Sequence, residues 1–192
     1  KDIDADISEV ESNYFMPIGM SGINAPEFGE ENIKEAVRDL CKTQRAKVAL
    51  YSYSYTDTRQ GSVIIPQTYT YGRTTTTTYS ASNYSVRRFD YVVVLFVPMP
   101  PLKLGFRYAD LTNKIRQAAE RNNGVYVRVV YKNSNAFNAN IMVGDVITKM
   151  NNKDINNYDE MADFIAGLKT GDKVTITLVR NAKVLQIRLT AT

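Results

Sequence analysis

Residues 124–147 read GVYVRVVYKNSNAFNANIMVGDVI and carry most of the information about the architecture of this 192-residue protein. The first part, Val125 to Val130, is rich in β-branched residues and almost continuously apolar, which predicts a buried strand. An asparagine-rich stretch follows, and apolar residues return at Val146 and Ile147. The sequence therefore predicts a strand that leads through tight turns into a second strand.

Short elements continue in a regular order on both sides of this stretch. Upstream, Leu104-Gly105-Phe106 opens the segment, and a helix is expected over residues 109–121. Downstream, the sequence predicts a turn at Asn151-Asn152, a helix over residues 158–168, and strands over residues 173–180 and 183–190, joined at Asn181-Ala182.

This order resembles the PDZ domains of bacterial HtrA-like proteases. In that family a glycine-containing loop precedes a G-V-x-V strand. The motifs N-S-P-A, A-G-I, G-D-x-I and N-G follow, and a helix and two strands close the domain. The chain matches this order over nearly all of residues 102–192. We therefore expect an α+β protein whose C-terminal domain, residues 102–192, is a PDZ domain.

Three asparagines stand where the family pattern has another residue. Asn135 replaces a proline, and Asn140 and Asn152 replace glycines. Asparagine tolerates a positive φ better than most residues, so the two glycine turns are expected to survive the replacement. A general bias toward asparagine in the source genome fits these replacements equally well.

The resemblance implies a groove between an edge strand and a helix. A guest peptide would add to the strand edge, and backbone N–H groups of the glycine loop would hold its terminal carboxylate. The residues that the resemblance assigns to this groove are Leu104, Gly105, Phe106, Arg107, Tyr108, Tyr158, Ala162 and Ile165. Each of them is open to a plain core role instead, Phe106 and Ile165 most of all. Asp145 matches the G-D motif and is expected to be structural, not catalytic.

Residues 1–100 are expected to form a separate, small α/β domain of unknown function. Apolar residues at helical spacing predict a helix over residues 30–44, between strands over residues 14–21 and 46–55. A further strong strand, residues 90–97, ends at a proline cluster at positions 98–101. The boundary between the two domains is placed there.

Residues 56–85 are rich in Thr, Tyr and Ser. This composition predicts long polar β-hairpins with turns at Gly61 and Gly72, and a loop is the alternative. A tyrosine-rich polar surface also suits recognition, so a second binding site is a further hypothesis.

Composition excludes several kinds of catalysis. The chain has no histidine and one cysteine, Cys41. Ser-His-Asp and Cys-His mechanisms need an imidazole base, and zinc sites need more Cys or His ligands. We therefore expect no enzyme activity, no metal site and no cofactor.

Charge is unevenly divided between the two halves. Residues 1–102 carry 10 Lys and Arg against 12 Asp and Glu, a balance of −2, and residues 103–192 carry 14 against 8, a balance of +6. A basic C-terminal half favours anionic partners such as peptide carboxylates, while no basic helix or stacking motif points to nucleic acid.

These features favour a peptide-binding protein of the bacterial cell envelope. It would capture protein C-termini or extended segments as an adaptor. An exported, periplasmic or outer-envelope location is expected, with a leader removed from the sequence shown and a lipoprotein as one form. The alternatives are an accessory or regulatory subunit of a secretion or protease assembly, a self-associating scaffold, and an enzyme whose site lies in residues 1–100. A deep pocket in which Ser21 is hydrogen-bonded to Tyr and Asp side chains would favour the enzyme.

Overall fold

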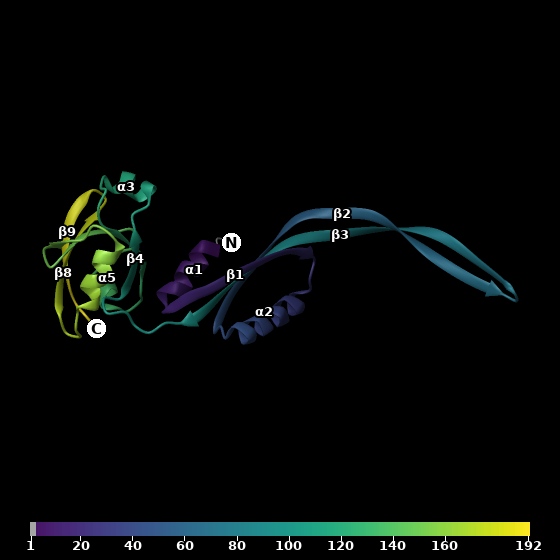
Figure 1. The fold of residues 1–192 in the computed structure, drawn as a ribbon, viewed down its shortest axis with the longest axis horizontal. Coiled ribbons are helices and arrows are strands. Elements are labelled where there is room, and N and C mark those ends of the chain that lie inside the picture. Colours follow the sequence, from purple (N-terminus) through teal and green to yellow (C-terminus); the bar gives the residue numbers. More distant parts are fainter. Residues whose placement is uncertain (1–2) are drawn as a thin grey trace. The chain divides into compact units, whose positions relative to one another are not determined.

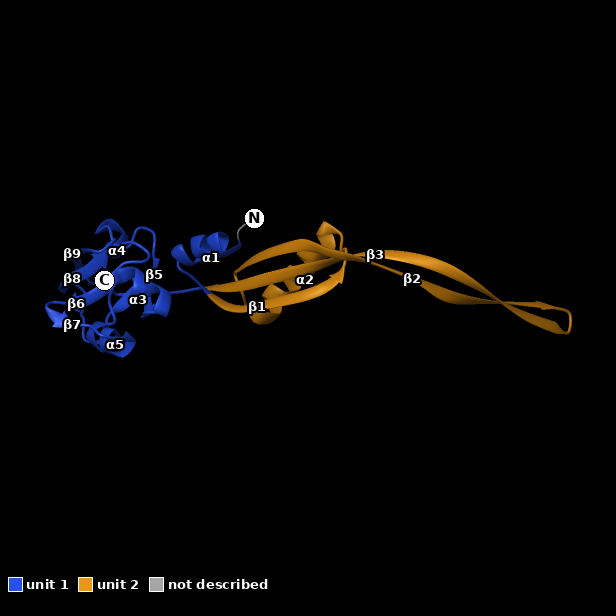
Figure 2. Ribbon diagram, turned by 90° about the horizontal axis from the view of Figure 1, so that it is seen from above, with its two compact units in different colours: residues 1–16, 98–192 blue, residues 17–97 orange. Residues whose placement is uncertain are grey.

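The computed structural model describes residues 3–192, which divide into two compact units (Figures 1 and 2). Of the described residues, 3–16 and 98–192 form one unit and 17–97 form the other. The protein is mixed and rich in strands. No helix in the described range has the length and apolar character that a bilayer span requires.

The unit that contains residues 98–192, called the C-terminal unit from here on, is built around a six-stranded sheet. Five of its strands follow the order β4-β5-β6-β8-β9, and β7 pairs with β6. Its strands are β4 (Phe106–Asp110), β5 (Val125–Val130), β6 (Val146–Met150), β7 (Lys153–Asp154), β8 (Lys173–Arg180) and β9 (Lys183–Thr190). Its helices are α1 (Ile3–Ser12), α3 (Asn113–Ala119), α4 (Asn135–Asn138) and α5 (Tyr158–Ala166).

One face of this sheet and helix α5 enclose the core. Along β5 every second side chain is buried, with Val125 and Val127 at 0% exposure and Val129 at 4%. Met161 of α5 is also fully buried and packs in the same cluster. The period-2 burial follows from the pleat, which turns successive side chains to opposite faces.

The predicted helix over residues 109–121 was wrong at its start. Ala109 and Asp110 belong to strand β4, because Ala109 pairs with Tyr126 of β5. Helix α3 begins only at Asn113, after Thr112, whose hydroxyl accepts a hydrogen bond from the Ile115 N–H at 3.3 Å. Local helical spacing was overridden here by pairing with a distant strand.

The two asparagines that replace family glycines adopt the backbone geometry that was expected. Asn140 has φ +63° and Asn152 has φ +67°, both in the left-handed region. Asn135 stands at the first position of α4, where proline is also well tolerated. Its amide donates to the Thr190 carbonyl at 2.6 Å and so ties α4 to the end of β9.

Residues Ile3 to Ser12 form helix α1, which is acidic and for which no helix was predicted from the sequence. Glu11 of α1 is only 3% exposed and lies 3.2 Å from the Arg107 guanidinium. Arg128 approaches the same carboxylate at 3.7 Å, and Glu9 pairs with Lys132. The negative helix thus packs on the basic half of the chain.

The N-terminal unit is mostly strands. Its sheet has the order β1-β3-β2, made of β1 (Phe15–Pro26), β2 (Val48–Tyr71) and β3 (Thr74–Pro98). Helix α2 (Glu30–Gln44) connects β1 to β2 and lies against one face of the sheet (Figure 1). The chain runs strand, helix, strand in the expected order. Strands β1 and β2 are not adjacent in the sheet, however, because β3 lies between them.

The Thr- and Tyr-rich segment forms one long hairpin, not several. Strands β2 and β3 pair antiparallel from Val48↔Phe96 to Tyr71↔Thr74, and Gly72 turns the chain with φ +60°. The turn expected at Gly61 is absent. Gly61 lies within β2, and a Cβ there would come within 2.6 Å of the Tyr84 hydroxyl, because the Tyr84 ring covers it.

Asp145 has a structural role, as its motif predicted. It is 1% exposed, and its two carboxylate oxygens accept from Arg180 Nε at 2.6 Å and Nη2 at 2.7 Å. It also accepts from the Met142 N–H at 2.9 Å, which closes the turn before β6. This hydrogen bonding raises the pKa of Arg180 above its ordinary value.

We predict that Asp145→Ala lowers the free energy of unfolding by about 3–5 kcal/mol, because it leaves the largely buried Arg180 guanidinium without its charged partner. Asp154→Ala is the control. It removes an exposed ion pair to Lys149, 2.9 Å long, and is expected to cost under about 1 kcal/mol. Urea denaturation followed by circular dichroism measures both, and equal losses would contradict the structural role of Asp145.

Candidate functional site

Strand β4 lies at one edge of the sheet, with helix α5 beside it (Figure 1). The Tyr131 N–H donates to the Gly105 carbonyl at 3.0 Å just before β4 begins. In an antiparallel ladder, bonded and non-bonded pairs alternate. The next pair, Phe106↔Val130, is therefore non-bonded, and the Phe106 N–H and C=O point away from β5.

The same orientation returns at Tyr108. Its partner Val127 uses its own N–H and C=O on the other side, toward Asp145 and Gly144 at 2.8 Å each. Phe106 and Tyr108 thus present a row of backbone donors and acceptors at the outer edge of β4. Among residues 3–192, no other strand pairs with that edge.

The loop before β4 is held in one conformation by Gly105. This residue has φ +79°, and a Cβ on it would lie 2.3 Å from Ser134 Cβ. Ser134 is buried. Its hydroxyl donates to the Gly105 carbonyl at 3.0 Å and accepts from the Phe137 N–H at 3.1 Å. Glycine is required here both for the backbone conformation and for the close approach.

Two backbone N–H groups of this loop have no hydrogen-bond partner in the described chain. The Gly105 N–H is already used, because it donates to the Leu102 carbonyl at 3.0 Å. The Leu104 N–H has no acceptor within the described chain, and the Phe106 N–H points outward by the alternation above. Neighbouring N–H groups of this kind form a favourable environment for an anion.

Helix α5 is fixed to the β4 segment at both ends. At its C-terminal end, Lys103 Nζ donates to the carbonyls of Ile165, Ala166 and Leu168 at 3.0, 3.0 and 2.8 Å. At its N-terminal end, the Tyr158 N–H donates to Asp110 Oδ1 at 2.7 Å. A cation at the C-terminus and a carboxylate at the N-terminus both suit the helix dipole. These contacts fix the position of α5 beside β4.

Aromatic side chains of β4 and α5 face each other at the N-terminal end of α5. The rings of Tyr108 and Tyr158 have centroids 4.9 Å apart and are tilted by 35°. Burial raises the pKa of Tyr108 to about 12, and the neighbouring Tyr158 phenol adds to the rise. The Tyr108 phenol is therefore uncharged at neutral pH.

The structure brings most of the expected groove residues together, with one exception. Tyr158, Ala162 and Ile165 all lie on α5, and Ile165 packs against the core cluster that contains Leu104 and Phe106. Leu104 and Phe106 are each 2% exposed as whole residues, so their side chains belong to the core.

Arg107 is the exception. Its side chain reaches Glu11 of α1, on the face opposite to Phe106 and Tyr108, because successive residues of a strand point to opposite sides. Its backbone belongs to the bonded pair with Val129. Arg107 therefore contributes to the docking of α1 and not to the gap between β4 and α5.

Sequence reasoning missed three residues that shape this site, namely Lys103, Asp110 and Ser134. A lysine directly before the glycine loop gave no local sign of its contact with residues more than 60 positions away. Ser134 could have been found, because a serine before a short helix is a common N-cap and its hydroxyl accepts from the residue three positions on.

The comparison with protein families agrees with this geometry. A family model described as "PDZ domain" matches residues 103–190. This segment is a PDZ domain. The match includes the glycine loop, β4 and α5.

The relatives of the PDZ domain are regions of larger proteases. The periplasmic pH-dependent serine endoprotease DegQ of Escherichia coli K12 is 32% identical over 89 residues, which are 45% of this chain and 20% of DegQ. The serine endoprotease DegS of Haemophilus influenzae is 38% identical over 80 residues, which are 42% of this chain and 23% of DegS. The chain thus spans about a fifth of the length of these relatives.

Solved structures give the same kind of match. The PDZ domain of HtrA3 bound to a phage-derived ligand (FGRWV) is 21% identical, with a TM-score of 0.41. The alignment covers 46% of this chain and 83% of that domain.

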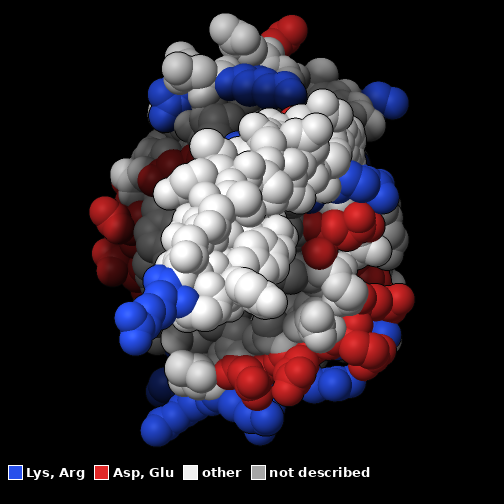
Figure 3. Space-filling view, turned by 90° about the vertical axis from the view of Figure 1, so that its right-hand side faces the viewer, with Lys and Arg blue, Asp and Glu red and all other residues white. Residues whose placement is uncertain are grey.

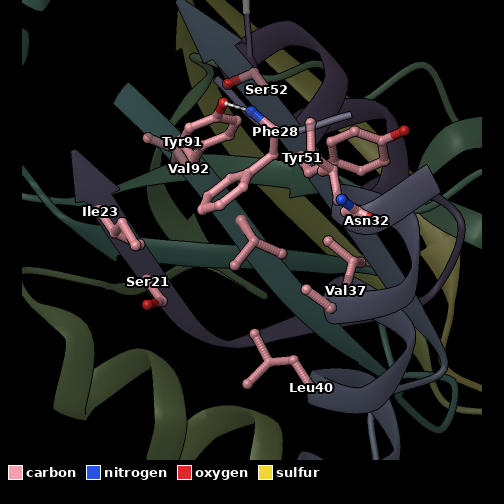
Figure 4. Close-up of a pocket in the computed structure, with 13 residues that line it drawn as sticks. Ser21, Ile23, Phe28, Asn32, Val37, Leu40, Tyr51, Ser52, Tyr91 and Val92 are labelled. Carbon is pink, nitrogen blue, oxygen red and sulfur yellow. Dashed lines mark hydrogen bonds between the residues drawn. The ribbon is translucent and has the colours of Figure 1, made fainter. Parts of the chain in front are cut away.

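The N-terminal unit contains a cavity of about 360 Å³ between α2 and the sheet (Figure 4). Its lining is largely apolar and includes Phe28, Val37, Leu40 and Val92. Ser21 lies at its border, and no hydrogen bond joins it to a tyrosine or carboxylate within residues 3–192. The arrangement that would favour a catalytic site is not found in this cavity.

We predict that Gly105→Ala destabilises the PDZ domain more than Gly144→Ala does. Gly144 also has a positive φ, +91°, but nothing lies within 4 Å of its added Cβ. Gly144→Ala is therefore expected to cost about 1–2 kcal/mol from backbone strain alone. Gly105→Ala should cost about 2 kcal/mol more, because Ser134 has to move. Denaturation curves of the two variants give the difference, and equal costs would show that the Ser134 contact is unimportant.

Proposed function

We propose that this protein binds C-terminal or extended peptide segments in the gap between β4 and α5 of its PDZ domain. The observation that carries the proposal is the open edge of β4, whose Phe106 and Tyr108 backbone groups have no partner strand in the described chain. A guest strand that pairs with this edge would form backbone hydrogen bonds independent of its own sequence.

The glycine loop supports capture of a terminal carboxylate. The Leu104 and Phe106 N–H groups lie at the start of the β4 edge, where the last residue of an antiparallel guest strand would end. Hydrogen bonds from N–H groups to a carboxylate are shorter and stronger than those to a neutral carbonyl. The positive balance of the C-terminal half adds a favourable field for an anionic chain end.

Residues of α5 would select the side chains of the guest peptide. Ala162 is small and half-buried, so it leaves room for an apolar side chain of the guest between Tyr158 and Ile165. The Tyr108–Tyr158 pair lies across the other end of the gap, and a longer guest would displace the half-exposed Tyr158 ring. Such a contact is small, so an affinity on the order of micromolar is expected.

The cellular setting is also part of the proposal. Relatives of the PDZ domain include proteases whose names place them in the periplasm. An exported envelope protein that acts as an adaptor fits both this relationship and the binding chemistry. The match extends only over the PDZ domain, so proteolysis is not carried over to this chain.

We predict that peptides with a free C-terminal carboxylate, selected from a random library, lose at least about tenfold in affinity when that carboxylate is amidated, since about 1.4 kcal/mol of charge-assisted bonding is lost. Fluorescence anisotropy with labelled peptides measures the change. Equal binding of both forms would show that the chain end is not recognised.

A variant pair tests whether the gap is the binding site. Ala162→Phe fills the space between β4 and α5 and should abolish binding of the selected peptides. Asp163→Phe is the control. Asp163 is exposed, and because it follows Ala162 directly in the helix, its side chain does not share the face of Ala162. Retained binding by Ala162→Phe would place the site elsewhere.

A further inference from the structure

The outer part of the β2–β3 hairpin, residues 60–86, is a two-stranded ribbon with no covering element. Strand β1 ends at Pro26, and the Glu27 N–H donates to the Arg87 carbonyl at 3.1 Å, so β3 has no outer neighbour from residue 86 to its start at Thr74. No side chain of residues 60–86 is buried. Two-stranded ribbons are only marginally stable in water, and a third strand normally stabilises them.

The ribbon is also almost free of charge. Arg73, in the turn, is the one charged residue among positions 60–86. Figure 3 looks onto this end of the unit, where the ribbon forms a continuous uncharged surface, drawn white. Exposed edge strands normally carry charges that prevent pairing with other chains. The absence of such charges over so long an edge indicates that pairing is tolerated here.

The two edges of the ribbon are not equivalent. Because the Arg87 carbonyl points outward to Glu27, every second residue along β3 also points its backbone outward. The regular register of β2 and β3 carries this alternation through to the turn. The outward residues of β3 are Thr75, Thr77, Tyr79, Ala81, Asn83 and Ser85.

Proline distinguishes the edge of β2. Pro66 pairs with Tyr79, so it occupies an outward position, and it has no N–H to donate. The row of donors is therefore interrupted in the middle of β2. The β3 row contains no proline and keeps all its donors.

We propose that β3 of one chain pairs with β3 of a second copy, antiparallel, about a two-fold axis across residues 74–86. The product is a four-stranded sheet with the order β2-β3-β3-β2. A two-fold axis makes the same strand face itself, so a charged edge could place like charges opposite each other. A neutral strand of Thr, Ser, Tyr and Asn avoids this repulsion in every register.

The chain itself favours a second copy as the occupant. The strands of the C-terminal unit have two to eight residues each, too few to pair along the whole of residues 74–86. A partner strand has to be long, uncharged and free of proline. Strand β3 meets each of these requirements, and an identical chain supplies it without any further component.

Sedimentation velocity of the full chain between about 1 and 100 μM tests the proposal, with a monomer–dimer equilibrium as the expected result. Thr77→Pro and Thr68→Pro are the matched variants. The two residues face each other in the ribbon, both point their N–H outward, and both substitutions remove the same hydrogen bond between the two hydroxyls, 3.0 Å long. They differ only in the edge that loses a donor.

Thr77→Pro should weaken the dimer at least about tenfold, and Thr68→Pro should leave it within about threefold. If circular dichroism shows that either proline disrupts the ribbon, Thr77→Lys and Thr68→Lys are compared in the same way, since a charge on the β3 edge opposes pairing with another chain. A monomeric wild-type protein over the whole range, equal effects of the two substitutions, or a larger effect on the β2 side would each overturn the proposal.

Discussion

Backbone groups at the edge of a β-sheet need partners, and this requirement governs both parts of the molecule. Antiparallel pairing uses the N–H and C=O of every second residue and leaves the others directed outward. In the C-terminal unit this leaves Phe106 and Tyr108 of β4 unpaired beside α5. In the N-terminal unit it leaves the outer half of β3 unpaired over residues 74–86. The edge of β4 is short and flanked by a helix, and the edge of β3 is long and has no flanking element.

The surroundings of each edge decide what it can accept. Beside β4 lies a helix that Lys103 and Asp110 hold at its two ends, and under our proposal this edge accepts a single extended chain. The ribbon has no such boundary, and its pairing surface is limited only by its own length. The same hydrogen-bonding chemistry therefore underlies both proposals, peptide binding in one unit and self-association in the other.

Prediction from sequence succeeded where local chemistry is sufficient. The order of turn and strand motifs between Gly105 and Arg180 identified the PDZ domain, and asparagine's tolerance of positive φ explained Asn140 and Asn152. It failed where a distant partner decides. Ala109 belongs to β4 because it pairs with β5, and Gly61 lies within a strand beneath the Tyr84 ring. Helix α1, which docks on Arg107, was not predicted at all.

The amino-acid sequence alone determined that no histidine-based chemistry is available, that a glycine opens the loop before the edge strand, and that residues 60–86 are nearly free of charge. These are properties of single residues and of short patterns. Only the tertiary structure decided that Lys103 fixes the end of α5, that Arg107 turns away from the gap, and that β1 stops short of the outer half of β3. Such facts depend on contacts between segments that are far apart in the chain, and local periodicity carries no information about which of them meet.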